Sequence, residues 1–147
     1  FFSQPPLGRG YDDGIVAARA VLDMLDRNPG QTMADMRRAL PVSFSSPTMS
    51  PACTDEEKYA IVDQIAEAYK ARSEILGRKV RDVLTVNGVR FTLEDGAWGL
   101  VRASSNTPNL VIVVESPNSA EDMKAIFRDI QTELAKHPGI GAFDQEL

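Results

Sequence analysis

The chain has 147 residues, of which 43% are hydrophobic and 25% are charged. This balance predicts one compact domain plus an additional segment, because a second full core would need more chain. The formal net charge of -5 argues against a general nucleic-acid or anionic-membrane binder, since phosphate polyanions require a surplus of Lys and Arg. A local cluster of donors can still bind a small anion.

Cysteine content and hydropathy indicate the cellular setting. Cys53 is the only cysteine, which excludes an intrachain disulfide and a thiolate metal site and suits the cytoplasm. No apolar run approaches the roughly 20 residues that cross a bilayer, so we expect a soluble chain. Residues 1–8, FFSQPPLG, have no Met start, no basic region and no cleavage pattern, and we interpret them as an internal cut in a longer protein.

The first 40 residues predict two helices. Asp12 or Asp13 is the expected N-cap of the first, whose apolar positions recur at Ile15, Ala18, Leu22 and Leu25 before Asn28-Pro29-Gly30. Thr32 is expected to cap a short helix to about Ala39. If these residues belong to a domain that lies mostly outside the chain, their apolar face is expected to pack loosely or to self-associate with a second copy.

A Pro- and Ser-rich stretch, residues 41–53, is predicted to be a linker, with an extended strand beginning near 49. Thr54 and Glu57 have the spacing of a capping box. The helix that follows is predicted to reach about Arg72 and to bury one apolar face, formed by Tyr59, Val62, Ile65, Ala66 and Tyr69.

After Gly77 the hydrophobic period changes to two, which indicates strands. Asn87-Gly88 predicts a hairpin with a type I′ turn, and Asp95-Gly96 predicts a second turn. Residues 110–114, LVIVV, predict a strand that is buried on both faces. Ser119 is expected to cap a last helix, which ends at His137-Pro138-Gly139 and buries Met123, Ile126, Phe127, Ile130 and Leu134. Adjacent strands with segregated helices predict an α+β fold with an antiparallel sheet and helices packed on it.

The candidate site is the loop between the strand ending near Val101 and the strand starting near Asn109. It reads RASSNTP, and Arg102 carries a guanidinium whose geometry matches phosphate oxygens. Further neutral donors come from Ser104, Ser105, Asn106 and Thr107. Such residues suit a bound phosphate, although Ser, Asn, Thr and Pro are also ordinary turn formers, and a purely structural loop remains the alternative.

Residues 87–90, NGVR, and 94–104, EDGAWGLVRAS, resemble the C-terminal signature of the α-D-phosphohexomutases, the phosphomannomutase/phosphoglucomutase family. In that family a "DGVR" hairpin leads through "GWGLVRASNTEP" or "GWGLVRASNTTP" into an apolar strand. Residues 11–15, YDDGI, and 55–58, DEEK, resemble two further family segments in the same order. These matches cover nearly the whole chain.

The resemblance implies the tail of the third domain in residues 1–40 and a fourth domain in 54–147, with a TATA-binding-protein-like layer. The complete family enzyme interconverts hexose 1-phosphates and 6-phosphates with a phosphoserine and Mg²⁺. Its "RASNT" loop grips the phosphate that does not react, and Arg102 and Ser104 would take that role directly. Ser105 stands where the family usually has Asn, Asn106 where it has Thr, and Thr107 where it has Thr or Glu.

The resemblance also implies what this chain does not supply. The family's catalytic serine loop, Asp-rich metal loop and sugar loop have no match in these 147 residues. We therefore expect the chain alone to be an inactive phosphosugar-binding domain that needs the remaining domains of its parent enzyme. Preference for mannose or glucose is outside its content. The alternative reading is a non-catalytic protein-interaction module with the same α+β fold.

Four other residue sets have simpler interpretations than chemistry. His137 lies beside Pro138 at a helix end, where a cation complements the dipole. Asp12-Asp13 resemble a metal pair but suit helix capping. Cys53 has no motif around it and is expected to be inert. Trp98 is expected to pack in the core rather than to stack on a sugar.

Overall fold

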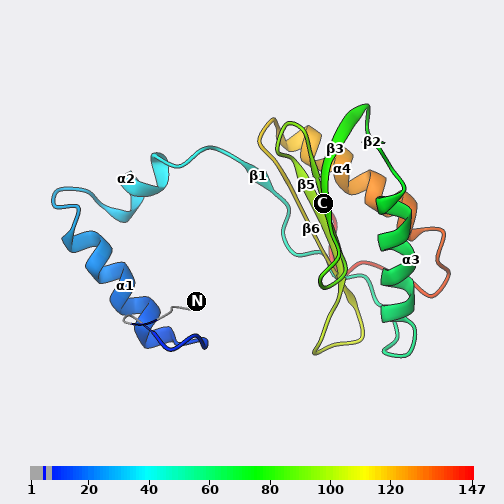
Figure 1. Ribbon diagram of the computed structural model, residues 1–147, viewed down its shortest axis with the longest axis horizontal. Helices are drawn as coiled ribbons and strands as arrows, with labels where there is room; N and C mark the ends of the chain where they lie inside the picture. The colour runs from blue at the N-terminus through cyan, green and yellow to red at the C-terminus, as the bar shows by residue number, and fades with distance from the viewer. Residues whose placement is uncertain (1–4, 6–7) are drawn as a thin grey trace. The chain divides into compact units, whose positions relative to one another are not determined.

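The computed structural model describes Pro5 and residues 8–147 (Figure 1). The chain divides into two compact units, Phe1–Pro41 and Val42–Leu147. Each unit is described by itself. No helix in the described part of the chain combines the length and the apolar character that crossing a membrane requires.

The first unit contains helices α1 (Gly14–Asp26) and α2 (Met33–Arg38). Asp13 caps α1, because its carboxylate accepts hydrogen bonds from the first-turn amides of Ile15 and Val16 at 2.9 and 3.0 Å. Thr32 caps α2 in a reciprocal capping box with Asp35. Both predicted helix starts are confirmed.

The apolar side chains of the first unit are largely exposed. Neither α1 nor α2 contains a buried residue, and Ile15 and Leu22 are 85% and 60% exposed. The second unit, by contrast, contains a continuous core. The prediction that the first helices pack less tightly than the rest of the chain is confirmed.

The second unit is one six-stranded antiparallel sheet with two helices. The strand order is β1-β6-β5-β4-β3-β2, and every neighbouring pair is antiparallel. In chain order the elements are β1 (Phe44–Ser45), α3 (Lys58–Lys70), β2 (Glu74–Ile75), β3 (Arg78–Leu84), β4 (Val89–Leu93), β5 (Trp98–Ala103), β6 (Leu110–Ser116) and α4 (Ala120–Leu134). The predicted α+β class with an antiparallel sheet is confirmed.

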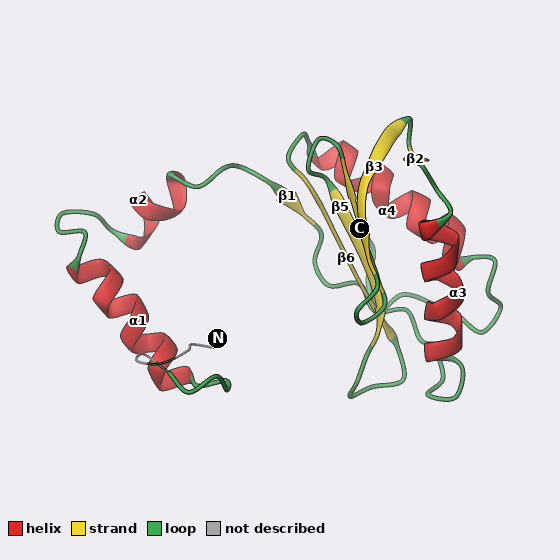
Figure 2. Cartoon of the chain, viewed as in Figure 1, coloured by secondary structure: helices red, strands yellow, loops and turns green. Residues whose placement is uncertain are grey.

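The core lies between the sheet and the two helices, which are on the same side of it (Figure 2). Tyr69 of α3 stacks on Phe91 of β4 with ring centroids 4.7 Å apart. All five predicted core residues of α4 are buried, and Ser119 caps that helix by accepting from the Asp122 amide at 3.0 Å. The prediction that residues 110–114 are buried on both faces is wrong: Val111 and Val113 are only partly buried, because α3 and α4 both pack on the other face of the sheet.

The other face of the sheet also carries Trp98. Residues Gly99, Val101 and Ala103 point into the core, so alternation places Trp98 on the opposite face, where it is partly exposed. There the Arg90 guanidinium lies 4.5 Å from the Trp98 ring centroid. The expected core position of Trp98 is therefore wrong.

The segment expected to be a linker is paired along β6. Phe44 and Ser45 pair with Ser116 and Glu115, and two hydrogen bonds of 2.9 Å join Met49 and Ile112. Backbone pairing continues to Ala52, which bridges Asn109. The second compact unit therefore starts at Val42 rather than at 54. The prolines of this stretch do not prevent the pairing, since proline is compatible with an edge strand.

The start of α3 differs from the predicted capping box. Glu57 is the cap residue and makes no side-chain cap bond; instead the Thr54 hydroxyl donates to the Glu57 carboxylate at 3.0 Å. The helix ends at Lys70 rather than Arg72. Its buried face includes Lys58 and Ile61, whereas Tyr59 is 56% exposed, so the prediction that Tyr59 is buried is wrong.

The hairpin at Asn87-Gly88 is confirmed, but its turn is not type I′. Leu84 pairs with Arg90, which leaves a longer loop, residues 85–89, between the paired positions. Gly88 has φ of 87°, while Leu76 is the sole non-glycine residue with positive φ in the described part of the chain. A type I′ turn needs positive φ at both central residues. The Asp95-Gly96 turn is confirmed, with Gly96 at φ of 92°.

Candidate phosphate-binding loop

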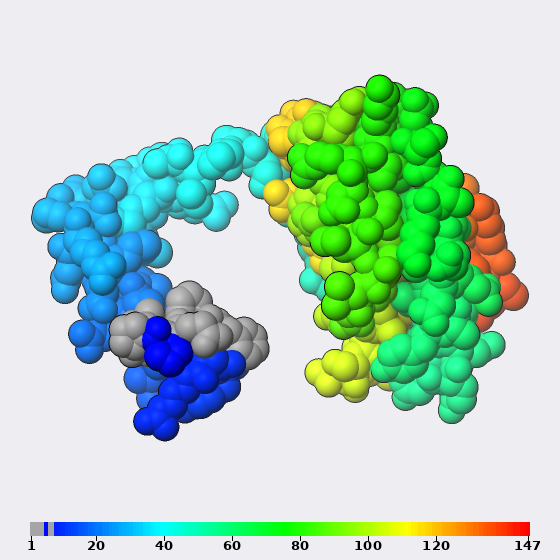
Figure 3. Space-filling view, in the orientation of Figure 1, coloured from blue at the N-terminus to red at the C-terminus, as the bar shows by residue number. Residues whose placement is uncertain are grey.

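The candidate loop connects β5 to β6 and is closed by its own backbone. Ser104 donates its amide to the Asn109 carbonyl at 3.0 Å, and the Asn109 amide donates to the Thr107 carbonyl at 2.9 Å. The loop projects from the second unit beside the start of α3 (Figure 3). The sheet thus presents this segment at one end of the neighbouring strands β5 and β6.

Hydroxyl groups organise the interior of the loop. The Ser104 hydroxyl lies 2.8 Å from that of Thr107, and the Thr107 hydroxyl lies 2.8 Å from the Asn109 side-chain oxygen. The Asn106 amide points to the Ser104 hydroxyl at 3.4 Å. Ser104 is buried, while Ser105, Asn106 and Thr107 are exposed. The four residues following Ala103 therefore form one bonded turn whose tip faces solvent.

Arg102 lies outside this bonded turn. Because Val101 and Ala103 point into the core, the Arg102 side chain extends on the face of the sheet opposite to α3 and α4. It is partly buried, and its guanidinium donates to the Ala103 carbonyl at 3.1 Å. The structure thus brings together Ser104, Asn106 and Thr107 and leaves the Arg102 charge at the base of the loop.

A groove of about 470 Å³ adjoins this end of the sheet. It lies between α3 and the turn that joins β3 to β4, and it reaches Ala103, the residue before the loop. Its charged lining is mixed, with Asp63, Glu67 and Lys70. This lining offers no uniform set of donors for an anion, so the loop remains the better phosphate candidate.

One residue beside the loop was not predicted from the sequence. Lys58, the first residue of α3, has a side chain that is only 4% exposed, and its ammonium donates to the Thr107 carbonyl at 3.2 Å. It also donates to the Asp55 carboxylate at 2.5 Å. Lys58 belongs to the DEEK segment, which resembles a family segment and lies at a predicted helix start, but neither feature predicts a contact with the loop.

Cys53 and His137 have structural roles. Cys53 is buried, and burial, followed by the charge of Glu57, raises the pKa of its thiol, which keeps it protonated and unreactive. The His137 amide donates to the Leu134 carbonyl at 3.0 Å and closes the turn after α4. Within Pro5 and residues 8–147, no group of three or more His, Cys, Asp or Glu side chains is arranged to hold a metal ion.

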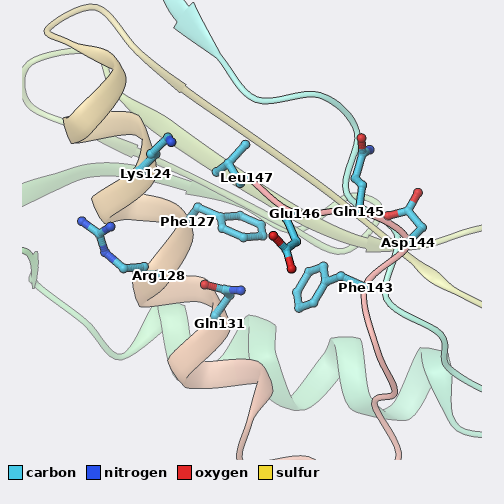
Figure 4. A pocket seen from close by; sticks show the side chains of 9 residues that line it. All are labelled: Lys124, Phe127, Arg128, Gln131, Phe143, Asp144, Gln145, Glu146 and Leu147. Atoms are coloured by element: carbon cyan, nitrogen blue, oxygen red, sulfur yellow. The ribbon is translucent and has the colours of Figure 1, made fainter.

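A larger hollow, of about 680 Å³, lies between α4 and the C-terminal segment. Figure 4 shows Phe127 of α4 near Phe143 of that segment; their ring centroids are 5.4 Å apart and edge-on. Lys124 and Arg128 line one side, and Asp144 and Glu146 line the other. Opposite charges offset each other there, so this hollow is not a ready anion site.

Residues 52–133 match the family described as phosphoglucomutase/phosphomannomutase, C-terminal domain. The match covers more than half of the chain and includes the whole candidate loop. The fold and the loop therefore define a C-terminal mutase domain. The chain belongs to the phosphoglucomutase/phosphomannomutase family.

Named relatives agree with this assignment. The chain is 36% identical over 121 residues to a phosphomannomutase/phosphoglucomutase of Pseudomonas putida, a match that covers 81% of this chain and 24% of the relative. It is 28% identical over 105 residues to a phosphopentomutase of Thermococcus kodakarensis, covering 71% of this chain and 22% of the relative. The chain thus spans about a quarter of the length of these curated relatives.

A solved structure gives the same result. A phosphoglucomutase/phosphomannomutase family protein of Burkholderia thailandensis superimposes with a TM-score of 0.67 and 26% identity. The superposition covers 90% of this chain and 26% of the other. The recognised resemblance to the phosphohexomutases is therefore confirmed.

Proposed function

We propose that this chain provides the substrate phosphate-binding loop of a phosphohexomutase that interconverts hexose 1-phosphates and 6-phosphates. The observation that carries the proposal is the position of the RASSNTP segment, which forms the β5–β6 loop inside the matched family domain. The parent enzyme would be an isomerase that moves a phosphoryl group within one sugar. Residues Arg102, Ser104, Ser105, Asn106 and Thr107 are the proposed contacts.

The chemistry of the loop supports a phosphate ligand. The Arg102 guanidinium bonds a neutral carbonyl, that of Ala103. A phosphate dianion is a stronger acceptor for a guanidinium, because both partners are then charged and two parallel bonds can form. The exposed tip adds the Ser105 hydroxyl, the Asn106 amide group and backbone N–H groups. Binding would therefore exchange weak internal bonds for charge-assisted ones.

The sugar itself is not specified by these residues. Relatives of this chain include proteins named phosphomannomutase/phosphoglucomutase and phosphopentomutase, whose names share the phosphoryl group and differ in the sugar. A loop that grips the non-reacting phosphate serves all of these substrates equally. Sugar preference, the phosphoserine and the Mg²⁺ ion are accordingly proposed for the remaining domains of the parent enzyme, and no metal step is assigned to this chain. A cytoplasmic location remains a prediction.

The test is a titration of the ¹⁵N-labelled chain with inorganic phosphate, followed by amide chemical shifts. We expect saturable shifts at residues 104–107 in the wild type and their loss in Arg102→Ala. Arg81→Ala is the matched control, because Arg81 is an exposed arginine on the same sheet and lies outside the loop. Unchanged loop amides in the folded wild type, at constant ionic strength, would refute the proposal and leave the loop as an ordinary turn.

A further inference from the structure

The ammonium of Lys58 is buried against the proposed phosphate loop. Its side chain is 4% exposed, although it belongs to the first residue of a helix, where lysine usually reaches solvent. The two hydrogen bonds it makes join different elements: Asp55 before α3 and the Thr107 carbonyl of the β5–β6 loop. Lys58 is thus a charged link between α3 and the loop.

Burial of a charge needs a compensating reason. Removing an ammonium from water costs several kcal/mol unless it is paired and hydrogen-bonded, and an apolar residue would fill the same space without that cost. Backbone pairing already holds the loop base, since the Cys53 amide donates to the Pro108 carbonyl at 3.0 Å and Ala52 bridges Asn109. The additional charged link therefore does more than attach the loop to the sheet.

Thr107 is the residue on which the contacts of the loop converge. Its carbonyl accepts from both Lys58 and the Asn109 amide, while its hydroxyl lies in contact with Ser104 and Asn109. A hydrogen bond to the Thr107 carbonyl restrains the backbone of Thr107 and, with it, the position of the Thr107 hydroxyl. Through this hydroxyl, the position of Lys58 also constrains Ser104, and Ser104 in turn accepts from the Asn106 amide.

We propose that Lys58 is a positioning residue that preorganises the phosphate loop from behind. This inference rests on the proposed function of the loop. Without the buried ammonium, the Thr107 carbonyl loses a charged donor and the 104–107 turn samples more conformations. Phosphate binding must then include the entropic cost of ordering the loop, which weakens affinity without removing any direct contact.

The experiment compares four forms of the 147-residue chain by the same phosphate titration. Lys58→Met removes the charge and keeps the length of the stem, whereas Lys58→Arg retains a cation with several donors. Lys70→Met is the matched control, because Lys70 lies on the same helix in an exposed pair with Glu67. We expect the phosphate Kd of Lys58→Met to rise about tenfold, equivalent to about 1.4 kcal/mol, with partial recovery in Lys58→Arg. Lys70→Met should bind as the wild type does.

The outcomes separate this inference from the function on which it rests. If the wild type binds phosphate at the loop and folded Lys58→Met binds equally well, Lys58 only stabilises the fold, and the inference fails while the phosphate loop stands. If the wild type gives no loop shifts, both proposals fail. Should Lys58→Met not fold, Lys58→Gln replaces it, since a neutral amide still fills the site; wild-type affinity in that variant also overturns the inference.

Discussion

Gly88 lies directly against Arg102. A Cβ atom placed on Gly88 would come within 2.7 Å of the Arg102 Cα and 2.3 Å of the Val101 carbonyl oxygen. Gly88 also has φ of 87°, a conformation that side chains disfavour. The turn between β3 and β4 therefore packs against the backbone of Arg102, the residue proposed to bind the substrate phosphate.

We predict that Gly88→Ala destabilises the chain more than Gly96→Ala. Gly96 has φ of 92° but nothing within 4 Å of its Cβ position, so it reports the backbone cost alone, about 1 to 2 kcal/mol. Gly88→Ala adds a steric overlap worth about another 1 to 3 kcal/mol. Chemical denaturation of both variants measures the difference. Equal losses would show that the turn yields without strain.

A second prediction concerns acid stability. Arg78 donates to Asp95 at 2.8 Å and to Asp122 at 2.9 Å, which joins β3 to the β4–β5 turn and to the first turn of α4. Partial burial raises the pKa of both carboxyls, but bonds from Arg78, Asn118 and, for Asp122, Ser116 outweigh it, so each pKa lies below the ordinary value. The stabilisation is therefore present above the unfolded-state pKa of about 3.9 and is lost as pH falls through the folded-state values.

Arg78→Met should flatten this acid dependence. At neutral pH the variant should lose about 1.5 to 3 kcal/mol, because hydrogen bonds to charged groups are removed. As the pH falls through the folded-state pKa values of Asp95 and Asp122, which lie below the ordinary value, its stability should converge with that of the wild type, since protonated carboxyls no longer pair with Arg78. Urea unfolding at several pH values measures this, with the exposed Arg81→Met as control. A constant difference across the range would contradict the assignment.

In the full-length parent enzyme, Arg102→Ala should raise KM for the phosphosugar and also lower kcat. A charge-assisted bond contributes about 1.5 to 3 kcal/mol, which is roughly 10- to 150-fold in kcat/KM. The anchored phosphate also holds the reacting end in place, so the loss is shared by both constants. Arg102→Lys should recover only part, because it lacks the two-pronged geometry. Steady-state kinetics with circular dichroism as a folding control would refute this if folded Arg102→Ala kept wild-type kcat/KM.

The chain by itself should show no mutase turnover with glucose 1-phosphate or mannose 1-phosphate. Phosphoryl transfer needs a donor and charge neutralisation, and the chain spans about a quarter of its relatives' length. A coupled assay on protein purified from a host lacking its own mutase tests this. Turnover above the blank would contradict the assignment of catalysis to other domains.

The exposed apolar face of α1 should promote self-association of the chain. Ile15 and Leu22 are 85% and 60% exposed, and burying such side chains against a second copy removes apolar surface from water. Sedimentation velocity over a concentration series should show a weight-average sedimentation coefficient that rises with protein concentration. The double variant Ile15→Gln and Leu22→Gln should abolish the rise, whereas Arg19→Gln, on an exposed polar position of α1, should not. A wild type that stays monomeric would end this hypothesis.

Local sequence signals predicted most of the second unit. The Ser119 cap, the apolar periodicity of α4 and the turn at Gly96 are each set by residues close together in the sequence. The resemblance carried by residues 87–104 located the loop. The errors concern contacts distant in sequence. Trp98 and Val113 lie on the sheet face opposite to α3 and α4, and residues 44–52 pair with a segment more than 50 positions away. Lys58 was missed for the same reason, since its partner Thr107 lies 49 residues further on.

The pairing of residues 44–52 along β6 bears on how this domain should be cut for separate expression. The family match begins at residue 52, which makes that residue a natural place to truncate. A chain starting there would lose β1 and the Met49 bonds, and the backbone N–H and C=O groups of the apolar strand Leu110–Ser116 would be unpaired along one side. Long apolar edges recruit other strands into aggregates. The short edge strands β1 and β2 thus cover the backbone groups of the longer strands beside them, and expression from Val42 onward keeps both.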